Sequence, residues 1–150
     1  VGVVRRDPMA MRPFAGYDMG DYFGHWLEMG KNIPNPPKIF HVNWFRTDAD
    51  GHFIWPGFGD NMRVLLWILA RCEGKVDARE TAIGYVPYAK DINIEGLDIT
   101  EDTVNELLSV DNEAWLADVE NIKEFYDMIG GTVPCELREE LSALKARLSK

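Results

Sequence analysis

Apolar residues recur three or four positions apart in several stretches of the chain, which is the spacing of one face of a helix. These stretches predict five helices: one from Asp18 to Gly30, one that ends near Cys72, one from Thr100 to about Leu108, one that runs through Trp115 and Ile129 to Gly130, and one after Pro134. The second helix carries apolar residues on almost every side, so we expect it to be buried nearly all round.

Between the first two helices the pattern changes to one that is typical of extended chain. Lys38–Phe45 (KIFHVNWF) predicts a short strand, and Asp50-Gly51 is a strong hairpin-turn signal. If the turn is centred near Ala49, Phe45 and Phe53 lie opposite each other on one face. Residues 75–100 predict turns and short extended pieces. The predicted fold class is therefore mixed α/β, with short strands, a hairpin and several packed helices.

The segment 44–61, WFRTDADGHFIWPGFGDN, concentrates five aromatic residues, three glycines and a proline just before a helix. Large rings beside a glycine-rich bend could form a platform for a flat ligand, held between phenyl faces. The other interpretation is an ordinary small core, with Asp60 and Asn61 as plain helix caps. The residues alone leave both interpretations open.

Composition and charge exclude several classes of function. The net charge of −9 argues against nucleic-acid binding, and no stretch approaches the roughly 20 apolar residues of a membrane span. Cys72 and Cys135 lie far apart without a metal-binding spacing, and we expect Cys72 to be structural in a reducing, cytoplasmic compartment. The sequence contains neither G-x-x-x-x-G-K-[ST] nor a His, Asp and Lys cluster suited to a catalytic metal.

The run FHVNWFRTDADGHFIWPGFGDN resembles the C-terminal part of GTP-dependent phosphoenolpyruvate carboxykinase. RRDPMAMRPFAGY before it, and IGYVP, INIEGLDI and PCELREELSALKARL after it, extend the resemblance over nearly the whole chain. The resemblance implies an enzyme of gluconeogenesis that converts oxaloacetate and GTP into phosphoenolpyruvate, GDP and CO2. It also implies Mn2+, and Mg2+, as the metals of the intact enzyme.

The resemblance also assigns roles to particular residues. It places Phe45, Phe53 and Phe58 in an aromatic pocket for guanine, and it maps the nucleotide-contacting stretch onto Phe58, Gly59, Asp60 and Asn61. The Asn61 amide can both donate and accept, which suits the edge of guanine, whereas adenine would leave polar groups unpaired. Asp60 could accept from guanine, but helix capping is its favoured role.

The resemblance places no catalytic residue and no metal ligand in this chain. Residues 1–150 are interpreted as a C-terminal fragment of the GTP-binding and catalytic domain, which opens after a mobile lid loop and lacks the catalytic regions that precede it. We therefore expect the fragment alone to be inactive and the intact enzyme to be a monomer without nucleic-acid or membrane partners.

Two alternatives differ in the ligand of the aromatic segment. The first is a non-catalytic module that uses the same aromatic residues to bind another protein or a different flat molecule. The second is a carboxykinase relative that uses pyrophosphate or ATP, because phenylalanine rings stack on any purine and only the Asn61 edge and the nearby backbone favour guanine.

Overall fold

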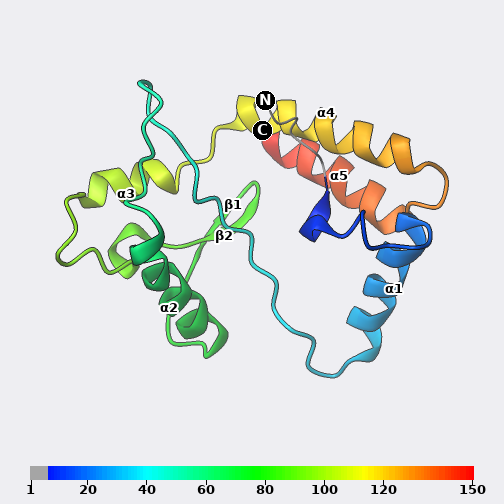
Figure 1. Cartoon of the computed structure of the whole chain (residues 1–150), viewed down its shortest axis with the longest axis horizontal. Helices are drawn as coiled ribbons and strands as arrows, with labels where there is room; N and C mark the ends of the chain where they lie inside the picture. Colours follow the sequence, from blue (N-terminus) through cyan, green and yellow to red (C-terminus); the bar gives the residue numbers. More distant parts are fainter. Residues whose placement is uncertain (1–6) are drawn as a thin grey trace. The chain divides into compact units, whose positions relative to one another are not determined.

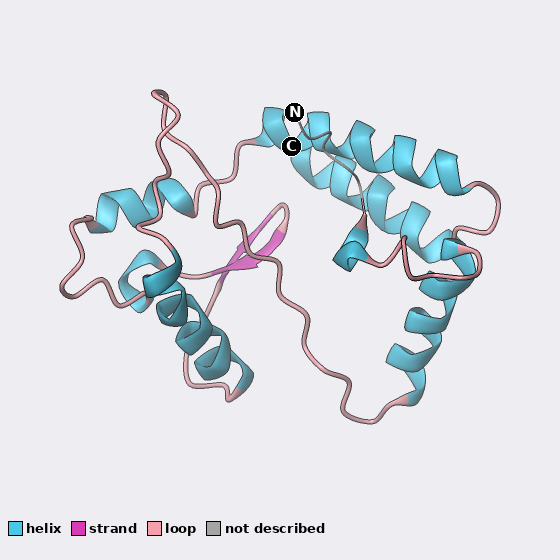
Figure 2. Ribbon diagram, viewed as in Figure 1, coloured by secondary structure: helices cyan, strands magenta, loops and turns pink. Residues whose placement is uncertain are grey.

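The computed structural model of the chain describes residues 7–150, which form two compact units. One unit contains the segment before Pro37 and the segment after Val110, and the other is Pro37–Val110. Figure 1 shows the elements along the chain, and Figure 2 shows that helices outweigh a single small pair of strands. No helix in the described part of the chain is long and apolar enough to cross a membrane.

The first unit is helical. It contains a 3-10 turn, η1 (Pro8–Ala10), and the helices α1 (Met19–Asn32), α4 (Asn112–Ile129) and α5 (Cys135–Leu148). Helices α4 and α5 pack side by side as an antiparallel pair. Phe23 of α1 and Phe125 of α4 are both buried, and their ring centroids lie 6.4 Å apart in an edge-to-face arrangement that aromatic pairs prefer. This contact ties α1 to the helical pair.

Gly20 brings the start of α1 very close to the loop before α5. A Cβ atom at Gly20 would lie 2.4 Å from the Thr132 carbonyl carbon, which is far inside van der Waals contact. Gly20→Ala is therefore expected to destabilise this unit by about 1–3 kcal/mol, because backbone has to move to relieve the overlap. Thermal unfolding followed by circular dichroism measures the effect.

Gly24→Ala, one turn further along α1, is the matched control. Its Cβ would lie 3.9 Å from Pro134 Cγ, an ordinary contact, so the better helix propensity of Ala should raise stability by roughly 1 kcal/mol. A lowered melting temperature for both variants would contradict the close approach at Gly20.

The contact between the start of α1 and the loop before α5 also includes the Asp18 carboxylate, whose ionisation affects the stability of the fold. Asp18 caps α1 by accepting from the Gly20 backbone N–H at 2.7 Å, and it also accepts from the Thr132 hydroxyl at 2.6 Å. The Thr132 and Gly20 hydrogen bonds together lower the pKa of Asp18 below its ordinary value. A carboxyl group with a lowered folded-state pKa stabilises the fold above its unfolded-state pKa of about 4, and this contribution is lost as the pH falls through the folded-state pKa.

Asp18→Ala should therefore lower the melting temperature at pH 7, and the difference from the unchanged protein should shrink as the pH falls below about 4. Melting curves recorded at several pH values measure this difference. A difference of the same size from pH 7 down to pH 2 would contradict the role of the ionised carboxylate.

The second unit combines helices with the β-hairpin. Its elements are η2 (Phe58–Asp60), α2 (Asn61–Cys72), β1 (Arg79–Thr81), β2 (Gly84–Val86), η3 (Ala89–Asp91) and α3 (Glu101–Leu107). The strands are antiparallel, with Arg79 opposite Val86 and Thr81 opposite Gly84. A buried core forms around two tryptophans, one residue each of η3 and α3, and the residue that follows η3: Trp55, Trp67, Ala89, Val104 and Ile92. This core holds the aromatic segment against α2.

The structure confirms the mixed fold class and the five predicted helices within the described residues. Asp18 caps α1, Thr100 caps α3, and Gly130 follows the last residue of α4, as the sequence predicts. Helix α1 extends two residues beyond Gly30, to Asn32. These starts and ends are local properties of the chain, which explains why they could be predicted.

The predicted strand at Lys38–Phe45 is wrong. These residues are irregular, and Ile39 is exposed. A strand forms only when a neighbouring strand pairs with its backbone groups, and the described residues provide no such neighbour for this segment. The Phe45 N–H instead donates to the Asn43 side-chain oxygen at 3.0 Å, a local bond of the kind that competes with strand pairing.

The predicted burial of α2 on all sides is also wrong. Only Trp67 is buried in this helix, while a row of apolar side chains is exposed: Met62, Leu65, Leu66 and Leu69. Cys72, expected to be structural on the apolar face, is exposed as well. An apolar pattern indicates which faces of a helix could be buried, but it does not indicate which other segments pack against them.

Candidate functional site

The aromatic segment folds back on itself in a tight turn. Thr47 pairs with Phe53 as an isolated antiparallel bridge, and the Ile54 N–H donates to the Arg46 carbonyl at 3.0 Å. The turn is therefore centred on Asp50, one residue later than the sequence suggested. Asp48 fixes the turn, because its Oδ1 accepts from the backbone N–H groups of two turn residues, Asp50 at 3.0 Å and His52 at 2.9 Å.

The turn brings the Phe45 and Phe53 rings together, but the residue opposite Phe53 is Thr47, and not Phe45 as the sequence predicted. Their ring centroids are 5.9 Å apart and the ring planes are inclined by 60°. Two parallel rings need about 7 Å between them to hold a flat ligand, because each stacking contact takes about 3.5 Å. The pair as it stands is therefore a wall on which a ring can stack, and not an open slot between two phenyl faces.

All three phenylalanines of the predicted pocket are open to solvent. Phe45 is 70% exposed, Phe53 is 64% exposed and Phe58 is 92% exposed. In contrast, Trp55 within the same segment is only 6% exposed. The segment thus places its two tryptophans, Trp44 and Trp55, in or against the core and leaves its three phenylalanines exposed. No ring contact within residues 7–150 joins Phe58 to the other two phenylalanines.

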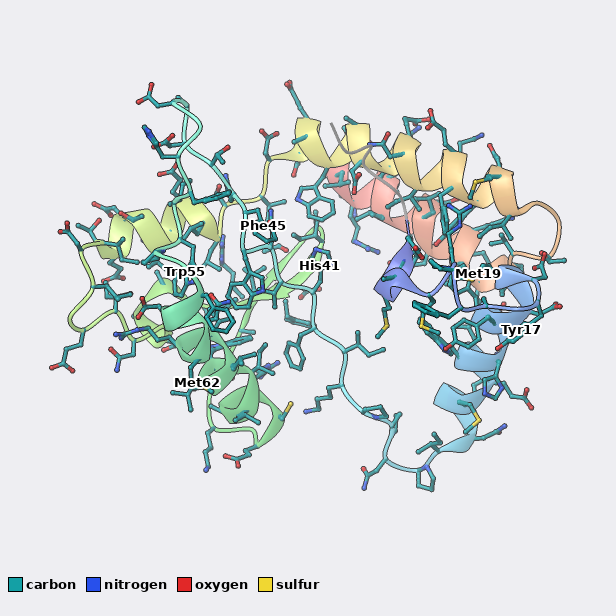
Figure 3. The ribbon with its side chains drawn as sticks, in the orientation of Figure 1. Tyr17, Met19, His41, Phe45, Trp55 and Met62 are labelled. Carbon is teal, nitrogen blue, oxygen red and sulfur yellow. The ribbon has the colours of Figure 1, made fainter. Side chains whose placement is uncertain are left out.

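The buried Trp55 side chain holds the predicted base-reading residue. The Trp55 indole Nε1–H donates to Asn61 Oδ1 at 2.9 Å, and Asn61 is the first residue of α2. The Trp55 ring in turn lies 6.4 Å from the Trp44 ring and belongs to the core of the second unit. Figure 3 shows the Trp55 and Phe45 side chains in this unit. The side-chain oxygen of Asn61 is therefore hydrogen-bonded to Trp55, and its NH2 group remains as a donor.

Asp60 occupies the N-cap position of α2, but its carboxylate makes no capping hydrogen bond within the described chain. It instead pairs with Arg63 Nε at 3.0 Å. The same guanidinium donates to the Asn93 carbonyl at 2.9 Å and to the Glu95 carbonyl at 3.0 Å. Side-chain capping, the role favoured for Asp60 from sequence, is therefore replaced by an ion pair that joins the start of α2 to the 93–95 loop.

Gly57 makes the approach to α2 possible. Its φ of 123° and ψ of −168° are reached almost only by glycine, and the next three residues form η2. The Asp60 N–H donates back to the Gly57 carbonyl at 3.1 Å, which closes this turn. The backbone of Phe58 and Gly59 is thus held at the N-terminal end of α2, where helices have unpaired N–H groups.

The Arg46 side chain, next to Phe45, anchors the beginning of the aromatic segment. The Arg46 guanidinium donates to the Leu107 and Ser109 carbonyls, both at 3.2 Å, and to the Ser109 hydroxyl at 2.8 Å. These bonds connect the aromatic segment to the C-terminal end of α3. The exposed Phe45 ring is therefore carried on fixed backbone, which reduces the entropy lost when a ligand binds.

One group in the described part of the chain has the composition of a metal site, namely Asp48, Asp50 and His52. All three are exposed, and Asp48 already accepts from two backbone N–H groups and lies 3.6 Å from His52 Nδ1 through its other oxygen. These contacts, led by the His52 backbone N–H, lower the pKa of Asp48. The group fixes the turn and does not fit a catalytic metal centre, so no metal is assigned to it.

The sequence predicted a site made of the three phenylalanines and Asn61, but it did not predict the contacts that hold Asn61 and Asp60 in place. The Trp55–Asn61 hydrogen bond joins residues six positions apart across a glycine-containing bend. The links from Arg63 to residues 93 and 95 span thirty positions or more. The WPGFG bend was the one available signal for the first contact, and no sequence signal pointed to the second.

Known proteins resemble this chain over almost its full length. Residues 1–147 match the family model described as the phosphoenolpyruvate carboxykinase C-terminal P-loop domain. A phosphoenolpyruvate carboxykinase (GTP) of Renibacterium salmoninarum is 55% identical over 150 residues. Proteins of the same name from Treponema pallidum and Anaeromyxobacter dehalogenans are 51% identical over 152 residues and 49% identical over 148 residues.

Each of these alignments covers 99% of this chain and 25% of the relative. The chain thus spans about a quarter of the length of the curated relatives that it matches. The family match confirms the resemblance on which the site residues were predicted, although their individual roles stay predictions. The chain belongs to the phosphoenolpyruvate carboxykinase family, and its residues 1–147 match the model of that family's C-terminal P-loop domain.

Proposed function

We propose that this chain forms the guanine-binding part of a GTP-dependent phosphoenolpyruvate carboxykinase. The complete enzyme would convert oxaloacetate and GTP into phosphoenolpyruvate, GDP and CO2, as the names of the relatives suggest. The observation that carries this assignment is the pair of exposed rings, Phe45 and Phe53, in the same segment as an asparagine whose amide is held by a buried tryptophan.

The exposed rings supply affinity for the base. A purine stacks on the wall formed by Phe45 and Phe53, and Phe58 adds a third exposed ring from η2. Stacking on an aromatic side chain contributes about 1–3 kcal/mol per base and does not depend on which base it is. The rings thus explain binding of a purine, but they do not explain a preference for guanine.

The polar groups at the start of α2 supply that preference. Guanine presents an acceptor at O6 and donors at N1 and N2, whereas adenine presents an amino donor at position 6. The Asn61 NH2 group is suited to donate to O6, and the backbone of Gly59 and Asp60 lies just before it. Asp60 is already paired with Arg63, so we assign it a supporting role in fixing the helix start.

Other expectations for the whole enzyme stay predictions. They are a cytoplasmic location, a monomeric state, and the use of Mn2+ or Mg2+ through ligands outside this chain. A bound divalent metal would neutralise charge on the transferred phosphoryl group, and none of the residues described above is given a step in that chemistry.

The test is turnover of the full-length protein, measured as phosphoenolpyruvate formed from oxaloacetate in the presence of Mn2+ with GTP, with ATP, or with no nucleotide. We expect turnover with GTP and little with the other two. Equal turnover with ATP would retain the carboxykinase and remove the role of Asn61 in choosing the base. Absence of turnover from a folded, full-length protein would favour a non-catalytic binding module.

A further inference from the structure

The hydrogen bond between Trp55 and Asn61 determines which end of the Asn61 amide can face a ligand. An indole N–H is only a donor, so the amide must turn its oxygen toward Trp55, at the observed 2.9 Å. In the flipped orientation the NH2 group would face another donor and the hydrogen bond would be lost. The NH2 end is therefore the one directed away from Trp55.

Both partners of this bond are held in place. Trp55 is 6% exposed and lies in the core of the second unit, which also includes Trp67 and Val104. Asn61 begins α2, and its backbone N–H bonds to the Phe58 carbonyl. A ligand therefore meets an amide whose orientation is already fixed, so little ordering is required on binding.

We propose that Trp55 is a positioning residue for base selectivity, because it holds Asn61 in the orientation that donates to the 6-oxo group of guanine. This inference rests on the proposed function, in which Asn61 faces the base. The free amide end is a donor, so it pairs with O6 of guanine but opposes the 6-amino donor of adenine. Without the Trp55 N–H, the amide can flip and accept from adenine, and selectivity should fall.

The test uses the full-length protein with Trp55→Phe, which keeps a buried ring and removes the N–H. Specificity constants, kcat/KM, are compared for GTP, ITP, ATP and 2-aminopurine riboside triphosphate. GTP and ITP both carry the 6-oxo group, and 2-aminopurine carries nothing at position 6. We expect GTP and ITP to lose about fivefold, 2-aminopurine to be unchanged relative to the packing control, and the preference for GTP over ATP to fall about tenfold.

Trp67→Phe provides the packing control. Trp67 is as buried as Trp55 and lies in the same core, but its Nε1 has no hydrogen-bond partner among residues 7–150. The same reduction in ring size there should affect all four nucleotides equally. If Trp55→Phe folds poorly, benzothienylalanine at position 55 replaces the N–H by sulfur at nearly the same volume, and the same four nucleotides are compared.

The result that would overturn the inference is an equal loss for all four nucleotides in both the Trp55 and the Trp67 variants, because Trp55 would then act through packing alone. The proposed function is tested separately by Asn61→Ala and Phe53→Ala. If those two variants change nucleotide use and Trp55→Phe leaves the base preference intact, only the role of Trp55 is wrong. If neither changes nucleotide use, the base binds elsewhere and both assignments fail.

Discussion

Asn61→Ala in the full-length protein is expected to lower kcat/KM for GTP roughly 10- to 100-fold, with little change in the KM for oxaloacetate or in the dependence on metal concentration. The variant loses the NH2 donor that the base would use. It also leaves the buried indole N–H of Trp55 without its partner, which adds a cost that every nucleotide shares. The loss specific to guanine is therefore measured as the change in the ratio of kcat/KM values for GTP and ATP.

Asn105→Ala is the matched control for this substitution. Asn105 is an exposed asparagine of α3 in the same unit, so its replacement should leave all three kinetic parameters unchanged. Equal losses toward GTP, oxaloacetate and metal in Asn61→Ala would contradict a role in reading the base. Such a result would indicate that Asn61 serves only to hold the start of α2.

Phe53→Ala and Phe45→Ala are each expected to weaken nucleotide binding by about 5- to 150-fold, the range that corresponds to 1–3 kcal/mol of stacking. Because phenyl faces stack on any purine, GTP and ATP should lose affinity by the same factor. Both rings are largely exposed, so the melting temperature of the protein should change little. Isothermal titration with GDP and ADP measures the two affinities.

Phe14→Ala controls for the loss of an exposed ring, because Phe14 is 81% exposed and belongs to the first unit. Its replacement should leave nucleotide affinity unchanged. The stacking role would be contradicted if Phe53→Ala left GDP binding intact, or if it weakened GDP and left ADP unchanged. Weaker GDP binding with unchanged ADP binding would mean that Phe53 helps to select guanine and does not simply stack on the face of any purine.

The two predictions separate affinity from selectivity. Loss of a phenylalanine should weaken both purine nucleotides equally, whereas loss of Asn61 should change their ratio. A module that uses the same rings to bind another protein would show neither effect on nucleotides. The contrast between Phe53→Ala and Asn61→Ala thus distinguishes a base-binding site from a general apolar surface.

The helices were predictable because their signals are local. Asp18 and Thr100 cap the helices that follow them, and Gly130 directly follows α4, each through bonds within a few residues. The strand at Lys38–Phe45 was not predictable in the same way, since pairing depends on a second segment that the sequence pattern does not reveal. The exposure of α2 depends equally on what lies against it.

In the candidate site, too, the local features could be predicted from the sequence and the features that depend on tertiary packing could not. The Asp50-Gly51 signal was sufficient to bring Phe45 and Phe53 together, because a turn fixes the positions of its nearest neighbours. The hydrogen-bond partners of Asn61 and Asp60 could not be predicted in this way, because each side chain has several possible bonds of similar energy and tertiary packing selects one. Trp55 and Arg63 provide the selected bonds; the sequence placed Trp55 only among the aromatic residues of the segment and assigned no role to Arg63.

The most direct measurement is a crystal structure of the full-length protein with GDP and Mn2+ bound. The guanine ring is expected about 3.5–4 Å from the face of Phe45 or Phe53, with O6 about 3 Å from Asn61 Nδ2 and the bond from Trp55 to Asn61 Oδ1 retained. A guanine ring bound away from these three residues would contradict the assignment of this segment as the base site.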